Sequence, residues 1–495
     1  MDRRGRYLSA TVIVGAALAP FVLASPGCKQ DEEEPVAIDP VDLRDPEACA
    51  DCHPVHYREW LGSMHAYAAE DPVFRALNAK AQRETNGELG DFCVKCHAPV
   101  ALALGLTEDG LNLDEVPQEA QGVNCWFCHQ AEAVEGTHNN PLRLAMDAIM
   151  RANVTDPLEP DAHLVEQSTL FDRNHVDSSK MCGSCHDIVA PAGAHVERTF
   201  AEWQASFYGD PDPDDPTEPA PWGLSCSSCH MGRTTGAIAD YPGVPGDRNR
   251  HAHSFVGVDV AVTDFPDAEL GPQLRAEQLA EIEEVRQTSL CASMCVREDP
   301  DTMGAEINVW LHNEGAGHSW PSGATPDRRA WVEVIARDDA DAVLYSSGVV
   351  GDDEAIAELE DPDLWLFRDR VFDAEGNETH AFWNAASYES NLLPAPAELN
   401  PETEGASWRT QSYTLDAMPA RANMRVLIRP MGLEILHELV ESGDLDAAVV
   451  EQFSTFEVPP TVLEWTPETA LPSMGEVDYG SCVSSSPGCL SPDIE

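Results

Sequence analysis

The sequence predicts an α+β multidomain protein in which a mainly α-helical, loop-rich domain is followed by an antiparallel β-sandwich domain. Two observations support this division. Up to about residue 300 the chain carries five copies of the pattern Cys-x-x-Cys-His, among short segments with little sustained amphipathic periodicity. Beyond residue 300 apolar and polar residues alternate, which is the pattern of half-buried strands. The length of 495 residues fits two or three domains.

Residues 1–28 have the pattern of an export signal. Three arginines precede an apolar run from Tyr7 to Ala24 that ends in small residues. One alternative is a retained membrane anchor, because the run is borderline in length for a membrane span. Another is lipoprotein processing at Cys28, although Pro26 departs from the usual lipoprotein pattern; residues 29–45 would then form an acidic tether. Each alternative predicts a periplasmic or cell-surface protein.

Each copy of Cys-x-x-Cys-His has the residues that attach a haem covalently. The two thiols add across the haem vinyl groups, the two-residue gap matches the vinyl spacing, and the histidine binds iron from one face. Zinc also binds paired cysteines, but a zinc site does not require a histidine after every second cysteine. We therefore expect five covalent haem c groups in a domain that spans residues 46–300. The attachment residues are Cys49, Cys52 and His53; Cys93, Cys96 and His97; Cys125, Cys128 and His129; Cys182, Cys185 and His186; and Cys226, Cys229 and His230.

Short helices are expected around the motifs, as over residues 71–85 and 272–288. Loop-rich segments of this kind cannot build an ordinary core, so large apolar porphyrins would fill the interior in place of side chains.

Residues 301–470 are predicted to form the β-sandwich, of roughly immunoglobulin size. Helices are expected over residues 433–440 and near 445–451, and the tail 471–495 is expected to be disordered. The segments with strand alternation are 306–312, 330–336 and 424–428, and turn residues lie at 374–377 between such runs.

Of the 15 cysteines, ten lie in the five motifs and one is Cys28. The other four predict two local disulfides in an oxidising compartment, Cys291 with Cys295 and Cys482 with Cys489. Free buried thiols are an alternative for the first pair.

The formal net charge of −57 makes nucleic acid and anionic membrane surfaces poor partners, because long-range repulsion opposes their approach. Membrane contact would then depend on a lipid or N-terminal anchor. We expect redox proteins as partners, with a quinol-linked membrane donor as one candidate. The negative charge would attract a basic partner toward the protein. The alternative is that the acidic surface serves only to keep the protein soluble.

Haem iron bound to one histidine has an open sixth position, which a second strong ligand closes in electron carriers. Twelve of the 17 histidines lie outside the motifs. His312, His380 and His437 are interpreted as surface or hydrogen-bonded residues, and His138 and His195 are left undecided. The candidate second ligands are His65, with His56 as its alternative, His163, His175, His251, His253 and His318.

A duplicated segment follows the first and fourth motifs, and we call each copy a Trp frame. The first frame runs from Trp60 through Ser63 to His65, and the second from Trp203 through Ser206 to Tyr208. If the frame presents an axial ligand, the second copy has lost it.

These residues resemble the multihaem cytochromes of the cytochrome c-554 kind. The resemblance covers most of residues 45–460. It rests on the segments Cys49–Ala66, Gly122–Asn124, Cys182–Asp187, the fifth motif with Met231, Asn313–Gly323 with Arg328 and Arg329, and the run to Arg429 and Pro430.

The resemblance implies an electron-transfer protein with closely packed haems, mostly ligated by two histidines, in a mainly helical domain. His65, His175, His253 and His318 lie where that family carries histidines, and His163 is our choice for the fifth partner. Tyr208 departs from the family pattern.

The leading hypothesis is an exported relay that passes electrons between a membrane or periplasmic donor and an acceptor, with no catalytic residue. The alternative is a multihaem oxidoreductase with one open haem that acts on nitrite or hydroxylamine, although no Cys-x-x-Cys-Lys signature is present. A third hypothesis makes the sandwich a docking module with the haems as an electron store.

Overall fold

The computed structural model describes residues 42–158, 163–209, 223–300, 302–396, 407–473, 477–486 and 489. These residues all belong to one compact unit, residues 37–495. The expected export signal and Cys28 lie outside the described residues, as does most of the acidic tether. No helix of the described ranges is long and apolar enough to cross a membrane.

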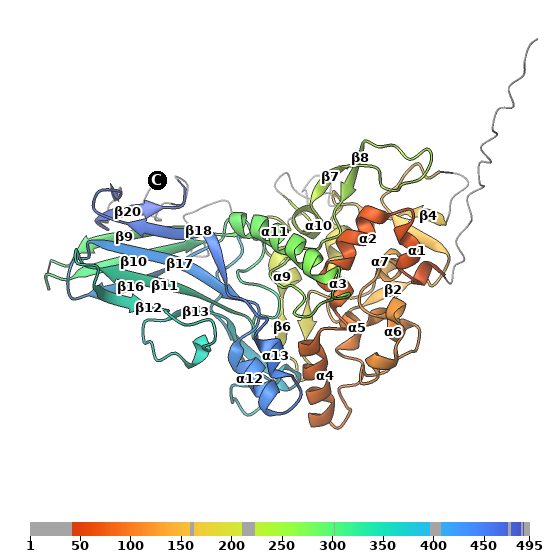
Figure 1. Cartoon of the computed structure of the whole chain (residues 1–495), viewed down its shortest axis with the longest axis horizontal. Coiled ribbons are helices and arrows are strands. Elements are labelled where there is room, and N and C mark those ends of the chain that lie inside the picture. The colour runs from red at the N-terminus through yellow and green to blue at the C-terminus, as the bar shows by residue number, and fades with distance from the viewer. Residues whose placement is uncertain are drawn as a thin grey trace, which may run out of the picture. The chain divides into compact units, whose positions relative to one another are not determined.

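The first part of this unit is built from short helices (Figure 1). Its α-helices are α1 (Glu47–Ala50), α2 (Pro54–Leu61), α3 (Met64–Tyr67), α4 (Pro72–Glu84), α5 (Val94–His97), α6 (Pro99–Ala103), α7 (Cys125–His129), α8 (Asp177–Gly183), α9 (Thr199–Gln204), α10 (Cys226–His230) and α11 (Gly271–Ser289). Its 3-10 helices are η1 (Asp42–Arg44), η2 (Leu113–Glu115), η3 (Gln118–Ala120) and η4 (Thr169–Phe171).

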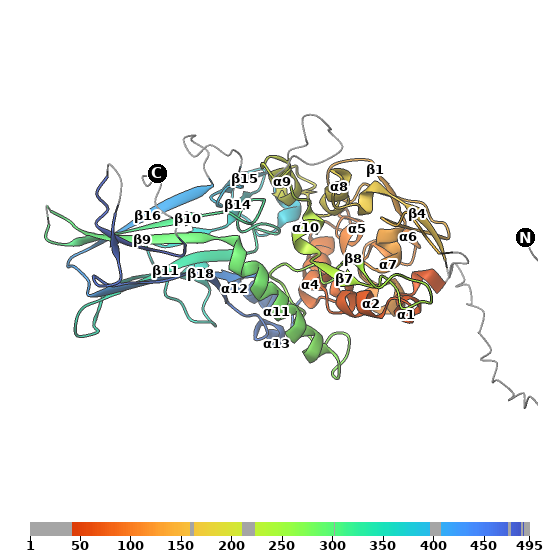
Figure 2. The same ribbon diagram turned by 90° about the horizontal axis from the view of Figure 1, so that it is seen from above.

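Local sequence explains the two longer helices that the pattern predicted. Asp71 caps α4 by accepting the N–H of Val73 at 2.9 Å, and Pro72 occupies the first helical position, where its missing N–H costs nothing. The helix α11 also has a proline in its first turn and runs almost directly into the sheet region (Figure 2). Both predicted helices are therefore confirmed to within one residue of their expected ends.

Paired short strands connect these helices. They are β1 (Ala131–Val134) with β2 (Leu142–Leu144), β3 (Ile149–Ala152) with β4 (Leu164–Gln167), β5 (Ile188–Val189) with β6 (His195–Glu197), and β7 (Arg233–Gly236) with β8 (Arg248–His251).

The second part holds two large antiparallel sheets and a two-stranded one, β14 with β15. One large sheet has the order β16-β10-β9-β20-β19, and the other has the order β12-β11-β17-β18 with β13 paired to β11. The strands are β9 (Cys291–Glu298), β10 (Ala305–His312), β11 (Arg329–Arg337), β12 (Val343–Ser347), β13 (Trp365–Phe367), β14 (Asp369–Phe372), β15 (Ser387–Ser390), β16 (Trp408–Leu415), β17 (Arg421–Arg429), β18 (Phe456–Trp465), β19 (Leu471–Pro472) and β20 (Ser481–Ser484). The helices are η5 (Ile356–Glu358), η6 (Phe382–Asn384), α12 (Leu433–Glu441) and α13 (Ala447–Val450).

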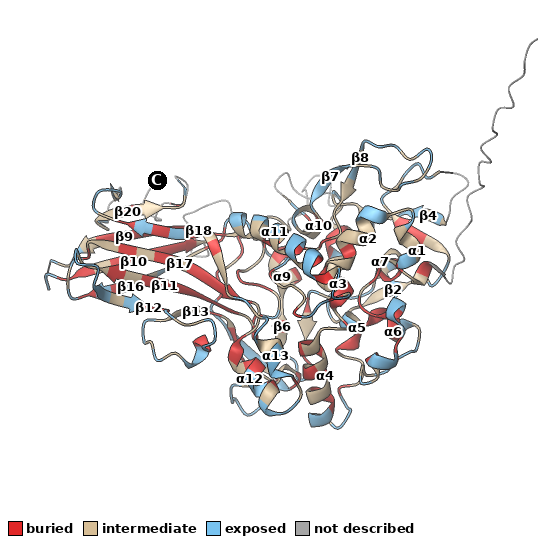
Figure 3. Cartoon of the chain, in the orientation of Figure 1, coloured by how far each residue is buried: buried red, intermediate tan, exposed pale blue. Residues whose placement is uncertain are grey.

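Apolar side chains from both sheets form one buried core. Met294 and Ile307 come from one sheet, Val332 and Val426 from the other, and each is fully buried. Figure 3 shows these strands as the largest run of buried residues. The predicted fold class, a helical part followed by an antiparallel sheet region, is confirmed.

The division between the parts differs from the prediction at two places. Strand β9 begins at Cys291, before the expected domain start at residue 301, so the sandwich takes its first strand from the predicted haem domain. Strand β20 lies within the tail 471–495 and pairs with β9, so the prediction of disorder is wrong for these described residues. The tail has few apolar residues, and its pairing depends on a strand almost 200 residues earlier.

The two predicted disulfides are wrong in their pairing. Cys291 is bonded to Cys489 and Cys295 to Cys482, with Cα–Cα distances of 5.6 and 4.0 Å. Cys291 and Cys295 are four residues apart in one strand, which places their Cα atoms roughly 13 Å apart, too far to bridge. Cys482 instead lies directly opposite Cys295 in the ladder between β20 and β9.

Candidate haem sites

The motif cysteines lie on short helical turns. In the first, second and fourth motifs the histidine N–H donates to the carbonyl of the first cysteine, four residues earlier, at 2.7, 3.2 and 3.0 Å. The third and fifth motifs are the helices α7 and α10 themselves. Because residues three apart share one face of a helix, both thiols of a motif point the same way.

All fifteen motif residues line one cavity of about 1660 Å³. The cavity runs between the short helices and reaches the loop around His318 at the start of the sandwich part. Apolar side chains such as Leu77, Phe92 and Val123 make up much of its wall. A shared, largely apolar cavity with every attachment residue on its surface fits the porphyrins that the motifs predict.

Three pairs of histidine rings face each other across this cavity. His53 and His163 have ring centroids 6.3 Å apart, and His65 and His186 are 6.2 Å apart. An imidazole nitrogen binds a metal at about 2.0 Å and lies about 1.1 Å from its ring centre, so two rings on opposite sides of one iron are roughly 6.2 Å apart. The separation of each pair therefore fits a single iron held by two histidines.

His230 and His318 form the third pair, at 6.3 Å with an angle of 15° between the ring planes. His318 comes from the sandwich part, on the loop between β10 and β11. The loop thus brings a candidate ligand from the second part of the chain to the fifth motif.

Backbone carbonyls fix the ring orientation of several of these histidines. The Nδ1 atoms of His53, His129 and His230 lie 2.8, 2.6 and 2.5 Å from carbonyl oxygens. A carbonyl can only accept, so Nδ1 carries the proton and Nε2 is left free to bind a metal. His318 is held in the same way by the carbonyl of Ser319 at 2.8 Å.

His186 differs, because its Nδ1 lies 3.2 Å from a carboxylate oxygen of Glu197. Burial lowers the pKa of His186, but the hydrogen bond and charge of Glu197 outweigh it and raise this pKa to about 9. A carboxylate partner on a metal-binding histidine increases the basicity of the ligand.

Another predicted ligand, His253, lies partly buried beside the third motif. Burial lowers its pKa well below the ordinary range, and the charges of His56 and His129 act in the same direction. Its Nδ1 lies 3.0 Å from the carbonyl of His251, and its ring lies edge-on to His56 at 4.8 Å.

His97 and His129 pack against phenyl rings. Phe74 stacks on His97 at 4.2 Å, and Phe171 stacks on His129 at 5.0 Å. His175, which the resemblance also predicts as a ligand, is not among the described residues that line the cavity. Its Nδ1 instead accepts the N–H of Asp177 at 3.1 Å.

Motif thiols from different parts of the chain lie together. The thiols of Cys49 and Cys125 share a hydrogen bond that lowers the pKa of Cys49, although burial opposes it. The thiols of Cys182 and Cys226 also share a hydrogen bond. This contact is the first cause, and burial the second, that raises the pKa of Cys182. The first motif therefore adjoins the third, and the fourth adjoins the fifth.

The fourth motif also adjoins the second, because Cys96 is hydrogen-bonded to Cys185 and its pKa is raised by that contact and by burial. The charge of Cys185 further raises the pKa of Cys128, after burial, which is the larger cause. The fourth motif thus adjoins motifs two and five and lies within range of a charge interaction with motif three.

The duplicated Trp frames have matching contacts. The indole N–H of Trp60 donates to the carbonyl of Val123, and that of Trp203 to the carbonyl of Leu224, both at 2.8 Å. Val123 and Leu224 each lie two residues before the first cysteine of a motif. The two copies of the duplicated sequence therefore also make the same kind of contact with a haem motif.

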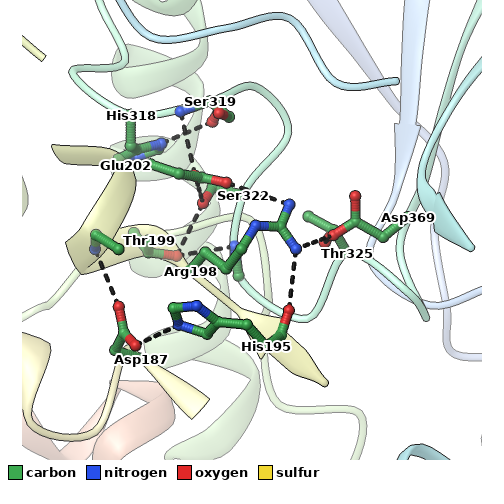
Figure 4. Close-up of polar contacts among 12 residues, drawn as sticks. Asp187, His195, Arg198, Thr199, Glu202, His318, Ser319, Ser322, Thr325 and Asp369 are labelled. Carbon is green, nitrogen blue, oxygen red and sulfur yellow. Dashed lines mark hydrogen bonds and ion pairs between the residues drawn. The ribbon is translucent and has the colours of Figure 1, made fainter. Parts of the chain in front are cut away.

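The loop of His318 is fixed by a polar network with the helical part (Figure 4). Glu202 accepts the N–H of Ser319 at 3.2 Å and the hydroxyl of Ser322 at 2.9 Å, and Arg198 lies 3.4 Å away. Burial raises the pKa of Glu202, and Arg198 opposes this rise.

The same network reaches strand β14, where Arg198 forms an ion pair with Asp369 at 2.7 Å. His195, left undecided by the sequence, forms a hydrogen bond with Asp187 beside the fourth motif.

Sequence reasoning missed Glu197, Glu202 and Arg198. For Glu202 the available signal was that a glutamate directly precedes the tryptophan in both Trp frames.

Comparison with known proteins supports the interpretation of the motifs as haem-attachment sites. Residues 48–130 match the family model described as cytochrome c554 and c-prime. No curated protein matches the chain. The fold is similar to that of the crystal structure of a penta-haem cytochrome c552 from Thermochromatium tepidum, with a TM-score of 0.57 and 20% identity over 86% of this chain and 99% of that chain.

The chain is therefore similar to multihaem c-type cytochromes, in sequence over residues 48–130, which hold the first three motifs and the first Trp frame, and in fold over most of its length. The predicted resemblance to cytochrome c-554 is confirmed for residues 48–130.

Proposed function

We propose that this protein is an exported c-type cytochrome that relays electrons through five covalently bound haems. The observation that carries the proposal is that all fifteen motif residues line one cavity, in which three histidine pairs have the spacing of axial ligands. When bound, the haems would supply one-electron chemistry. The protein residues attach them, provide ligands and exclude water.

Contacts between motifs support a relay rather than isolated sites. The first motif adjoins the third, and the fourth adjoins the second and fifth and lies within range of a charge interaction with the third. Cofactors attached at these positions would lie close together, which favours rapid electron exchange. The fourth site would be a branch point of the relay.

Intact mass spectrometry of the protein made with a haem-attachment system tests the proposal. We expect five haem additions per chain and no bound zinc. Fewer than five haems with free motif thiols, or zinc in their place, would contradict it.

A second candidate function is an oxidoreductase with one open haem, acting on a small nitrogen compound. The observation that favours it is at His97, whose ring contacts Phe74 and makes no ring contact with any of the five predicted second ligands, all of which are described residues. Carbon monoxide binding to one haem, together with rapid oxidation of the reduced protein by nitrite or hydroxylamine, would favour this candidate. Neither reaction is expected of a closed relay.

We propose redox proteins as partners, with a quinol-linked membrane donor as one candidate, and a periplasmic or cell-surface location with an anchor at Cys28. The high negative charge supports a basic partner, because opposite charges accelerate encounter. Electron transfer rates that fall steeply with ionic strength would support this preference, and rates independent of salt would contradict it.

A further inference from the structure

A glutamate precedes each Trp frame, and the two glutamates make the same kind of contact. Glu59 accepts the backbone N–H of His253 at 2.9 Å, and Glu202 accepts that of Ser319 at 3.2 Å. Ser319 directly follows His318. In both copies the carboxylate therefore fixes the backbone at a histidine that lines the cavity.

Each glutamate is also paired with an arginine. Nη1 of Arg250 lies 2.8 Å from both carboxylate oxygens of Glu59, and Arg198 lies 3.4 Å from Glu202. All four side chains are less than one fifth exposed. A buried carboxylate needs such a partner to remain charged, and a charged acceptor makes the stronger hydrogen bond to an N–H group.

The tryptophan that follows each glutamate holds the other side of a haem site. Trp60 binds the carbonyl two residues before Cys125, and Trp203 binds the carbonyl two residues before Cys226. The second copy thus contacts the segments of both His230 and His318, whose rings face each other at 6.3 Å. By the same arrangement, the first copy contacts the segments of His129 and His253.

We propose that Glu59 and Glu202 are positioning residues, each of which acts with the adjacent tryptophan to hold the two axial ligands of one haem. It follows that His253 is the second ligand of the haem attached at the third motif. This inference rests on the proposed function, since it concerns haem ligation.

The ring nitrogens of His253 support this assignment. Its Nδ1 is held by the carbonyl of His251 at 3.0 Å, which leaves Nε2 for iron, as in His318. The nearby ring of His56 is a competing candidate, but its backbone belongs to α2 and makes no contact with Glu59 of the kind that His253 makes.

The test compares ligand variants with glutamate variants by electron paramagnetic resonance of the ferric holoprotein. We expect His253→Ala to convert one low-spin haem to high spin, and Glu59→Ala to perturb the same low-spin signal. Glu59→Gln keeps a carbonyl acceptor for the N–H of His253, so it should retain that signal. In the second copy, Glu202→Ala should perturb the signal that His318→Ala removes.

Glu277→Gln serves as the matched control, because Glu277 is bonded to Arg58 on the protein surface and loses the same charge. It should leave all signals unchanged. The inference is overturned if His253→Ala leaves every haem low spin, or if Glu59→Ala and His253→Ala perturb different haems. If Glu59→Ala does not fold, His253→Ala still decides the ligand assignment and Glu202→Ala with His318→Ala decides the positioning role.

Failure of this inference is distinguishable from failure of the proposed function. A wild-type protein with five haems and an unperturbed His253→Ala variant contradicts the inference alone. A wild-type protein without five haems contradicts the proposed function.

Discussion

The two Trp frames share a scaffold but end in different residues. In both frames the serine hydroxyl donates to the tryptophan carbonyl, at 2.7 Å for Ser63 and 2.8 Å for Ser206. The first frame ends in His65, whose ring faces His186 of the fourth motif. The second ends in Tyr208, whose hydroxyl donates to the carbonyl of Glu314 at 2.9 Å.

Tyr208 packs against the loop that carries His318. Its ring contacts Gly317, where a Cβ atom would lie 3.4 Å from it. The first frame therefore supplies a candidate ligand itself, whereas the second supports a ligand that comes from the sandwich part. The same local structure can provide an axial ligand or brace the loop that provides one.

Among the variants that compare the two frames, loss of His65 should change haem ligation the most. His65→Ala removes the ring opposite His186, so we expect one haem to become high spin and to bind carbon monoxide. The ferric absorption spectrum and electron paramagnetic resonance measure the change. Tyr208→Ala is the matched variant in the second frame, and equal loss of a low-spin haem in both variants would show that the frames do not differ in this way.

Glu197 should set the reduction potential of the haem between His65 and His186. Glu197→Gln removes the negative charge beside Nδ1, which weakens the stabilisation of ferric iron. We expect the potential of one haem to rise by about 59 mV, a tenfold change in its reduction equilibrium. Glu306→Gln, which removes a carboxylate bonded to Arg297 in the sandwich, should shift no haem comparably in a potentiometric titration.

The indole hydrogen bonds of the two frames should contribute similarly to stability. Trp60→Phe and Trp203→Phe each leave a carbonyl without its donor, and each tryptophan is only 8% exposed. We expect each variant to lower the free energy of unfolding by about 1–3 kcal/mol. Thermal unfolding measures both, and a large cost in one frame with none in the other would argue against a shared role.

The sequence predicts the attachment sites well because their chemistry is local. The two cysteines and the histidine of each motif lie within one helical turn, so no distant contact decides their arrangement. The strand alternation and the capped helix at Asp71 are local for the same reason. Contacts between distant segments were not predictable, as the exchanged pairing of Cys295 with Cys482 shows.

The second axial ligands were less predictable than the attachment sites but more predictable than the disulfide pairing. His65 and His318 were found by their frame and by the resemblance, and the structure brings each to a motif histidine. His175 was chosen on the same resemblance but is not among the described cavity residues. The partners of Glu59 and Glu202 are backbone N–H groups more than 100 residues away, which no side-chain pattern reveals.

The hydroxyl of Tyr208 should have the smallest effect. Tyr208→Phe removes one hydrogen bond to a partly exposed carbonyl, so we expect a loss of about 1 kcal/mol or less. The number of low-spin haems should not change, because the ring still packs on Gly317. A new high-spin haem in this variant would assign Tyr208 a more direct part in ligation.

Quantified electron paramagnetic resonance of the ferric wild-type protein tests the central claim most directly, namely that facing histidine rings hold haem iron in this cavity. The three pairs His53 with His163, His65 with His186, and His230 with His318 predict at least three low-spin haems per chain. Fewer than three low-spin haems in a protein shown by mass to carry five would contradict the claim.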